Sequence, residues 1–113
     1  MARTVLIVDV HPSFRATARM LLESEGFEVV GEAEDGLSAI EAVQELGPNL
    51  VLLDVQLPDI DGIEVASRLT RNGNAPAIVL TSSRDLADLG SLGGARGFVP
   101  KSELSGAALE ALL

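Results

Sequence analysis

The sequence predicts an α/β fold in which helices cover both faces of a five-stranded parallel sheet, giving three layers. Two observations support this. Short apolar blocks recur along the 113 residues, and each is followed by polar residues and a segment with helical spacing. Several blocks are continuously apolar, which is typical of strands buried on both faces. The length fits one domain, 1–113, with a single core.

The strands are predicted from these blocks. They cover residues 5–8, 29–30, 50–53, 77–80 and 97–99. The first, third and fourth blocks contain no polar residue, so we expect them at the centre of the sheet.

Three helices are predicted from caps and periodicity. The first spans 12–25, because Pro12 suits an opening turn and Gly26 ends the apolar stripe. The second follows Asp35 and stops at Gly47, with apolar residues at near-helical spacing between them. The third is short and spans about 63–69, directly after Asp61 and Gly62 and before an Asn-Gly-Asn turn signal.

The rest of the chain is less regular. Gly90, Gly93 and Gly94 each cost about 1 kcal/mol in a helix interior, so any helix within 82–97 is expected to be short or loosely held. A final helix is predicted over 104–113, where no Gly or Pro stop signal follows. We therefore expect the sequence to end inside that helix.

Composition excludes several functions. The chain has 8 Lys and Arg against 17 Asp and Glu, a formal charge of -9, so this segment alone is not expected to bind nucleic acid. It has no cysteine, which removes disulfides, thiol nucleophiles and thiolate metal sites. The apolar runs are too short to cross a bilayer, and no signal-peptide pattern is visible. A soluble, cytoplasmic protein without a membrane partner is expected.

Polar side chains follow the predicted strands where each one ends. Asp9 and Asp54 close two strands, Thr81 and Ser82 close another, and Lys101 follows the last. The carboxyl ends of parallel strands meet at one edge, so these groups are expected to converge there. Two carboxylates, a hydroxyl and an ammonium suit phosphoryl transfer, with Mg²⁺ held by carboxylates and phosphate oxygens.

The residues around these strand ends resemble the receiver domain of two-component response regulators. Segments 5–9, 49–62, 79–82 and 97–101 carry the resemblance, which extends over essentially the whole chain. It implies a flavodoxin-like (CheY-like) fold with strand order 2-1-3-4-5. The sequence around His11 and around Gly94 is most similar to that of receivers that precede a LuxR/NarL-type helix-turn-helix output domain.

The resemblance also implies roles for individual residues. The expected roles are phosphoacceptor for Asp54, first member of an acidic pair for Asp9, Mg²⁺ ligand through its backbone carbonyl for Gln56, switch hydroxyl for Thr81, switch aromatic for Phe98, and phosphate contact for Lys101. A sensor histidine kinase is the implied partner. Homodimerisation through the first and last helices is implied too, and DNA would be bound only through an output domain that this chain lacks. A switch is expected rather than an enzyme, with at most self-phosphorylation and autodephosphorylation.

Two departures from the family pattern qualify these expectations. Val10 stands where receivers usually carry a second acid that binds Mg²⁺ directly, so we expect weak Mg²⁺ binding and slow or absent phosphorylation. The segment between Thr81 and Phe98 is about two residues shorter than usual, which is expected to alter their coupling. The alternative hypothesis is therefore an atypical receiver that acts as a phosphorylation-independent dimerisation or interaction module.

Other interpretations fit less well. A haloacid-dehalogenase-type phosphatase has an Asp at the position of Gln56, and a dinucleotide-binding fold has a Gly-rich turn after its first strand. Asp59 and Asp61 lack the spaced acids and the final Glu of a calcium loop, so turn and helix-cap roles are expected. The position of His11 next to Asp9 suggests a metal ligand or a base, but His11 is interpreted instead as a partly exposed residue at a helix start.

Overall fold

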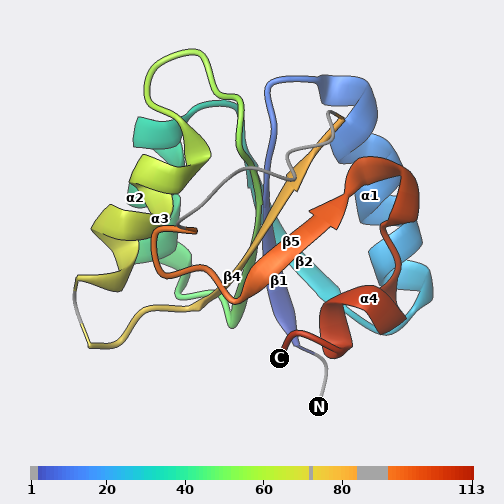
Figure 1. The fold of residues 1–113 in the computed structure, drawn as a ribbon. Helices are drawn as coiled ribbons and strands as arrows, with labels where there is room; N and C mark the ends of the chain where they lie inside the picture. The colour runs from blue at the N-terminus through green and yellow to red at the C-terminus, as the bar shows by residue number, and fades with distance from the viewer. Residues whose placement is uncertain (1–2, 72, 84–91) are drawn as a thin grey trace.

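The computed structural model describes residues 3–71, 73–83 and 92–113. Among them, five strands form one parallel sheet in the order β2-β1-β3-β4-β5, as predicted (Figure 1). The strands are β1 (Thr4–Val8), β2 (Glu28–Ala33), β3 (Leu50–Asp54), β4 (Ala77–Ser82) and β5 (Gly97–Pro100). The helices are α1 (Pro12–Ser24), α2 (Gly36–Leu46), α3 (Gly62–Thr70) and α4 (Gly106–Glu110), with a 3-10 turn at Lys101–Glu103.

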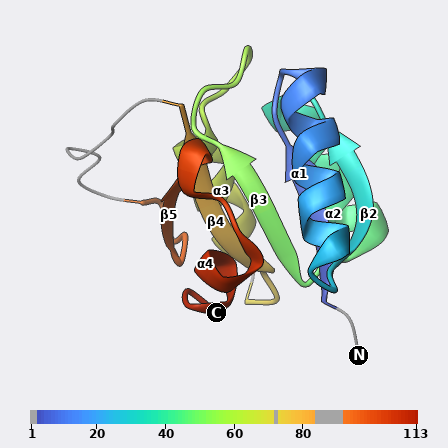
Figure 2. The same cartoon turned by 90° about the vertical axis from the view of Figure 1, so that its right-hand side faces the viewer.

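The sheet separates two apolar cores. Helices α2 and α3 cover one face, and α1 and α4 cover the other (Figure 2). Successive strand residues alternate between the cores: Leu6 and Val51 pack toward α2 and α3, whereas Ile7 and Leu52 pack toward α1 and α4. Each fully buried side chain of this size stabilises the fold by about 1.5–3 kcal/mol. This two-sided burial explains the continuously apolar strand sequences.

Helix caps fix the loops beside the sheet. Asp35 accepts a hydrogen bond from the Ser38 amide at the start of α2, and Asp61 accepts one from the Glu64 amide at the start of α3. The Asp59 carboxylate reaches from the loop after β3 and accepts bonds from two more amides of α2, at 2.8 and 2.9 Å. The cap roles expected for Asp59 and Asp61 are therefore confirmed.

Several predicted boundaries were wrong. The first helix ends at Ser24, one residue early, and β2 covers 28–33 instead of 29–30 because its polar residues pair with β1 at the sheet edge. The last helix spans only Gly106–Glu110. A 3-10 turn and extended Leu104 precede it, and Ser105 supplies its N-cap. The third helix is longer at both ends than 63–69, because Asp61 caps it one residue earlier.

The segment predicted to be a loosely held helix lies largely outside the described residues, which omit 84–91. The described part contains Gly93 and Gly94, whose φ angles of 62° and 95° are left-handed and not helical. Their turn lies against α3, where a Cβ on Gly93 would be 2.5 Å from the Ile63 carbonyl oxygen. Within the described ranges, no helix is long and apolar enough to span a bilayer.

Candidate functional site

Three charged side chains meet at the carboxyl edge of the sheet. Lys101 Nζ lies 2.6 Å from Asp9 Oδ2 and 3.4 Å from Asp54 Oδ2. The Asp9 and Asp54 side chains are 0% and 4% exposed, and Lys101 is 14% exposed. The strand ends thus bring together the two acids and the lysine that the sequence singled out. Burial of two carboxylates requires a counter-charge, and Lys101 supplies it.

Asp9 is contacted through its side chain and through its backbone oxygen. Its Oδ1 accepts a hydrogen bond from the His11 amide at 2.8 Å and lies 3.0 Å from His11 Nδ1. Its backbone oxygen accepts a hydrogen bond from Arg15 Nη1 at 2.6 Å. Burial alone would raise the pKa of Asp9, but the contacts with Lys101 and His11 outweigh it and hold the pKa below its ordinary value. Asp9 is therefore a fixed negative charge.

Asp54 is the less favourably placed carboxylate. It ends β3 opposite Thr81, and its Oδ1 accepts a hydrogen bond from the Gln56 amide at 3.1 Å. Burial raises the pKa of Asp54, and the neighbouring Asp9 charge raises it further, against the opposing effects of the Gln56 amide and Lys101. Of the two acids, Asp54 is the one whose charge the site balances less completely.

Lys101 is positioned both by its backbone, at the end of β5, and by the contacts of its ammonium group. It follows Pro100 at the end of β5 and opens the 3-10 turn. Its ammonium lies 4.4 Å from the centroid of the Phe14 ring, which comes from α1 on the same side of the sheet. The Phe14 ring and the two carboxylates together hold the Lys101 ammonium at the opening of the site.

Thr81 and Phe98 lie on different faces. The Thr81 side chain is fully buried, and its Oγ1 has no hydrogen-bond partner among the described residues. Such an atom is uncommon in a native interior and marks a place where a ligand can supply the partner. Phe98 pairs with Leu80 and packs, half-buried, against the core beneath α2 and α3. Its switch role remains a prediction.

The donor atoms at this edge suit a divalent cation. Asp9, His11 and Asp54 each offer a ligand atom within 4.8 Å of the others. The unpartnered Thr81 hydroxyl lies next to Asp54 in the sheet register. Val10 is 38% exposed and offers no ligand atom, so the site fits a cation with one carboxylate fewer than an acidic pair would give.

The sequence analysis gave too little weight to three residues at the start of α1. His11 contacts Asp9, Phe14 lies under Lys101, and Arg15 holds the Asp9 backbone. His11 is indeed exposed and caps α1, as expected, but its bond to Asp9 was not foreseen. The positions differ by three and four residues, which places them on one helix face directly after a strand-ending acid. That spacing was the available signal.

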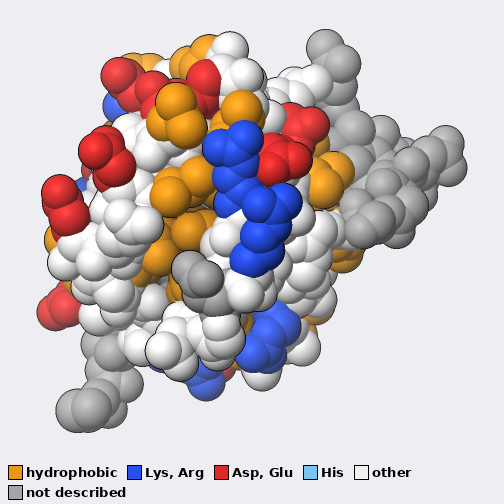
Figure 3. Space-filling view, turned by 90° about the vertical axis from the view of Figure 1, so that its left-hand side faces the viewer, with side chains coloured by type: hydrophobic (Ala, Val, Ile, Leu, Met, Phe, Trp, Pro, Cys, Tyr) orange, Lys and Arg blue, Asp and Glu red, His pale blue; other side chains and the backbone are white. Residues whose placement is uncertain are grey.

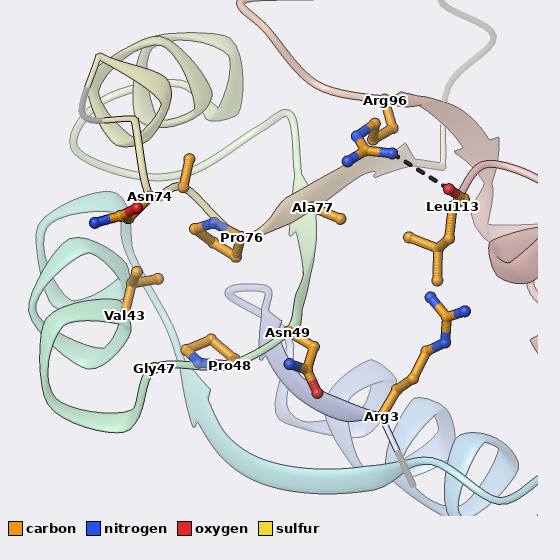
Figure 4. A pocket seen from close by; sticks show the side chains of 11 residues that line it. Arg3, Val43, Gly47, Pro48, Asn49, Asn74, Pro76, Ala77, Arg96 and Leu113 are labelled. Atoms are coloured by element: carbon orange, nitrogen blue, oxygen red, sulfur yellow. Dashed lines mark hydrogen bonds between the residues drawn. The ribbon is translucent and has the colours of Figure 1, made fainter. Parts of the chain in front are cut away.

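The described residues also form hollows away from this site. A cavity of about 490 Å³ opens at the amino ends of β1, β3 and β4 (Figure 4), where Arg96 Nη1 donates to the Leu113 backbone oxygen at 3.3 Å. A second hollow of about 330 Å³ lies between α2 and α3 and includes Ile40 and Leu69. Apolar side chains are visible among charged ones on that face (Figure 3). Neither is lined by Asp9 or Asp54.

The fold is that of a receiver. Residues 5–112 match the family model described as the response regulator receiver domain. The regulator BvgA of Bordetella pertussis is 42% identical over 107 residues, covering 91% of this chain and 51% of BvgA. The chain belongs to the response regulator receiver family, whose members act in two-component signalling.

Solved structures agree. The signal receiver domain of NarL from Mycobacterium tuberculosis is 32% identical with a TM-score of 0.85, covering 98% of this chain and 96% of that one. A LuxR-family two-component response regulator from Aurantimonas is 29% identical with a TM-score of 0.86, covering 99% and 86%. The chain spans about half the length of the curated relatives that it matches, such as BvgA, which is a transcription regulator by name.

Proposed function

We propose that Asp54 accepts a phosphoryl group from a sensor histidine kinase. The observation that carries the proposal is the position of Asp54, a buried carboxylate at the end of a central strand with Lys101 Nζ 3.4 Å away. The unpartnered Thr81 hydroxyl in the adjacent strand gives the site a further group with which to contact a phosphoryl oxygen. Family membership supports the same assignment.

The chemistry is a displacement at phosphorus. An Asp54 carboxylate oxygen attacks, an O–P bond forms, and the P–N bond to the donor histidine breaks with its electron pair on the ring nitrogen. Lys101 can then move its charge toward the phosphoryl oxygens, and Thr81 Oγ1 can donate a hydrogen bond to one of them. Asp9 stays ionised throughout and keeps Lys101 at the site.

Mg²⁺ is the cofactor that this chemistry calls for. Asp9, Asp54 and the Gln56 backbone carbonyl would hold it, and when bound it neutralises charge on the phosphoryl oxygens. Val10 removes one carboxylate from the set, so we infer weak Mg²⁺ binding. The family's general use of acidic residues to bind Mg²⁺ supports the assignment of Asp9 and Asp54 as ligands. The absence of an acid at position 10 lowers the expected affinity for Mg²⁺.

The output of the switch is a change in association. Phosphorylation of Asp54 would alter the surface near Thr81 and Phe98, and through it homodimerisation or a DNA-binding output domain. The half-length match to BvgA supports an output domain of the transcription-regulator kind. Helices α1 and α4 lie on one face of the sheet, which supports a shared association surface (Figure 1).

Intact mass spectrometry tests the proposal. The chain is incubated with acetyl phosphate and Mg²⁺, beside Asp54→Asn and Val10→Asp. We expect one phosphoryl adduct on the wild type, none on Asp54→Asn, and faster formation on Val10→Asp. An equal adduct on Asp54→Asn would refute the assignment of Asp54.

A second candidate function is supported by Val10 and Lys101. The exposed isopropyl group weakens the metal site, and Lys101 already forms ion pairs with both acids. In that case the chain is an interaction module that works without phosphorylation. Light scattering distinguishes the two: the module predicts the same dimerisation constant for wild type and Asp54→Asn with or without acetyl phosphate, whereas the switch predicts a change in the wild type alone.

A further inference from the structure

We propose that a cleft running from the space between α2 and α3 to the amino edge of the sheet binds an acidic peptide segment of a partner protein. The segment would place an apolar side chain between the two helices and carboxylates at the amino edge. The inference goes beyond the proposed function, because Asp9, Asp54 and Lys101 do not line this cleft. It rests on the continuity of two hollows and on the kinds of side chains that line them.

The hollow between α2 and α3 and the cavity at the amino edge share one wall. Four residues line both of them: Val43, Asn74, Ala75 and Pro76. The hollow of about 330 Å³ between the helices therefore continues into the cavity of about 490 Å³ at the amino edge. Ligand sites in proteins usually have volumes of about 300–1,000 Å³. The shared wall joins the two into one elongated cleft, which suits an extended chain.

The charges along this cleft are opposite to those of the chain as a whole. The chain carries 17 acids and 8 basic residues, yet the described residues that line the two hollows include three arginines and no acid. Arg68 lines the helical end, and Arg3 and Arg96 line the amino edge. The exposed acids of α2, Glu41 and Glu45, line neither hollow. A local excess of positive charge in an acidic domain favours an anionic partner.

Each of these arginines has donors available for a partner. Arg68 Nε lies 2.9 Å from a carboxylate oxygen of Glu64, and Arg3 Nη2 lies 3.4 Å from one of Glu110. Arg96 Nη1 donates to a backbone oxygen at 3.3 Å. A guanidinium group has five N–H donors and pairs with carboxylates through two of them. Each arginine can therefore accept a carboxylate from a partner without losing its contact within the chain.

The end of the cleft between the helices is apolar. Ile40 and Leu69 line it, and Val43 lies where it meets the amino-edge cavity. Ile40 and Val43 are only half-buried, and apolar side chains are visible on this face (Figure 3). Figure 4 shows Val43 at one side of the amino-edge cavity and Arg3 and Arg96 at the other. A matching segment therefore has an apolar side chain at one end and acids at the other.

The walls of the cleft are held by hydrogen bonds within the chain. The Gly47 amide donates to the Val43 carbonyl oxygen at 3.0 Å, where α2 ends. The Ala77 amide donates to the Asn49 carbonyl oxygen at 3.0 Å and joins the segments that precede β3 and β4. Pro76, in the shared wall, has a fixed φ. The cleft is therefore formed before a partner binds, which reduces the conformational entropy lost on binding.

NMR titration of the isotope-labelled 113-residue chain tests the proposal. The probe is a capped synthetic peptide with leucines in one half and glutamates in the other. We expect amide shifts at the residues that line the cleft. The dissociation constant should be at least about tenfold lower than for the same peptide with glutamines in place of glutamates, because one exposed ion pair contributes up to about fivefold and three arginines are available.

Three variants each make the net charge of the chain more negative by one. Arg96→Gln removes a cation from the cleft, and Asn74→Asp places an acid in the shared wall at an exposed position. Arg19→Gln is the matched control, because it changes α1 on the opposite face of the sheet. We expect the first two to weaken peptide binding about fivefold each and the control to change it less than about twofold. Equal losses in all three variants, each checked for folding by circular dichroism, would overturn the proposal.

Other occupants of the cleft give different results. Free glutamate that bound as tightly as the peptide would indicate a site for small anions. A dimer that forms without peptide and is dissociated by Asn74→Asp, measured by light scattering, would indicate a second copy of the chain. Either result would overturn the proposal, as would the absence of peptide-induced shifts at the cleft. Phosphorylation of Asp54 is measured separately by intact mass, so its failure leaves these results unchanged.

Discussion

The amino and carboxyl edges of the sheet differ in how their polar side chains are paired. At the amino edge, Thr4 and Asn49 bond reciprocally: the Thr4 amide donates to Asn49 Oδ1 at 2.9 Å, and the Asn49 amide donates to Thr4 Oγ1 at 2.9 Å. At the carboxyl edge, Asp9 and Asp54 are buried around one ammonium, and Thr81 Oγ1 has no hydrogen-bond partner among the residues that the structure describes. At the amino edge, Thr4 and Asn49 supply each other's hydrogen-bond partners. At the carboxyl edge, a ligand can supply the partner for the Thr81 hydroxyl.

The difference separates stability from function. Neutral, reciprocal hydrogen bonds at the amino edge stabilise the register of β1 and β3. The carboxyl edge keeps a carboxylate whose pKa is raised by burial and by its neighbour, which is a destabilising arrangement at neutral pH. Natural proteins accept such arrangements at functional sites. Removal of the Asp54 charge at the carboxyl edge should therefore raise stability, whereas truncation of Asn49 at the amino edge should lower it.

Removal of Lys101 should have the largest effect. In Lys101→Met the two buried acids lose their counter-charge, and loss of one partner from a buried ion pair costs about 3–5 kcal/mol. Urea unfolding at neutral pH measures the free energy of unfolding. Arg68→Met is the matched control, because Arg68 pairs with Glu64 on an exposed face of α3 and should cost less than about 1 kcal/mol. Similar losses in both variants would contradict the account.

Asn49→Ala should have the next largest effect. The variant removes the acceptor of the Thr4 amide and hydroxyl, so we expect a loss of about 1 kcal/mol in the free energy of unfolding. The phosphoryl adduct at the other edge should be unchanged. Reduced adduct formation at equal folded fraction would show that the two edges are not independent.

Asp54→Asn should act in the opposite direction. An amide at position 54 carries no charge to bury and does not repel Asp9, so we expect a gain of about 1 kcal/mol at pH 7 with complete loss of the adduct. The gain should shrink as the pH falls, because the wild-type carboxyl with its raised pKa then becomes neutral by protonation. A destabilised variant at pH 7 would mean that the bonds to Gln56 and Lys101 outweigh the burial of the charge.

Protonation of Asp59 should have the smallest effect, a loss of stability that appears only at acidic pH. Burial alone would raise the pKa of Asp59, but the hydrogen bonds from the Gly36, Leu37 and Ile60 amides together outweigh it and lower the pKa from 3.8 to about 2. A lowered carboxyl pKa stabilises the fold above about pH 4, and that contribution is lost as the pH falls toward 2. Carboxyl NMR titration should locate the midpoint near 2. A midpoint near 3.8 would mean that the cap on α2 is not held in solution.

The sequence predicted the fold and the meeting of Asp9, Asp54 and Lys101, because continuous apolar strands fix a parallel sheet whose carboxyl ends share one edge. It did not predict the bond from His11 to Asp9, since apolar periodicity describes burial and His11 is exposed. It also misjudged the last helix. There the Glu25 carboxylate accepts a bond from the Gly106 amide, a contact between distant residues that local spacing does not encode.

The central claim is that Asp54 carries the phosphoryl group. Borohydride reduction of the acyl phosphate after incubation with acetyl phosphate and Mg²⁺, followed by peptide mass spectrometry, locates the modified residue directly. We predict homoserine at position 54 in the wild type and none at that position without the phosphodonor. Homoserine at position 9 or 59 with unmodified Asp54 would contradict the account.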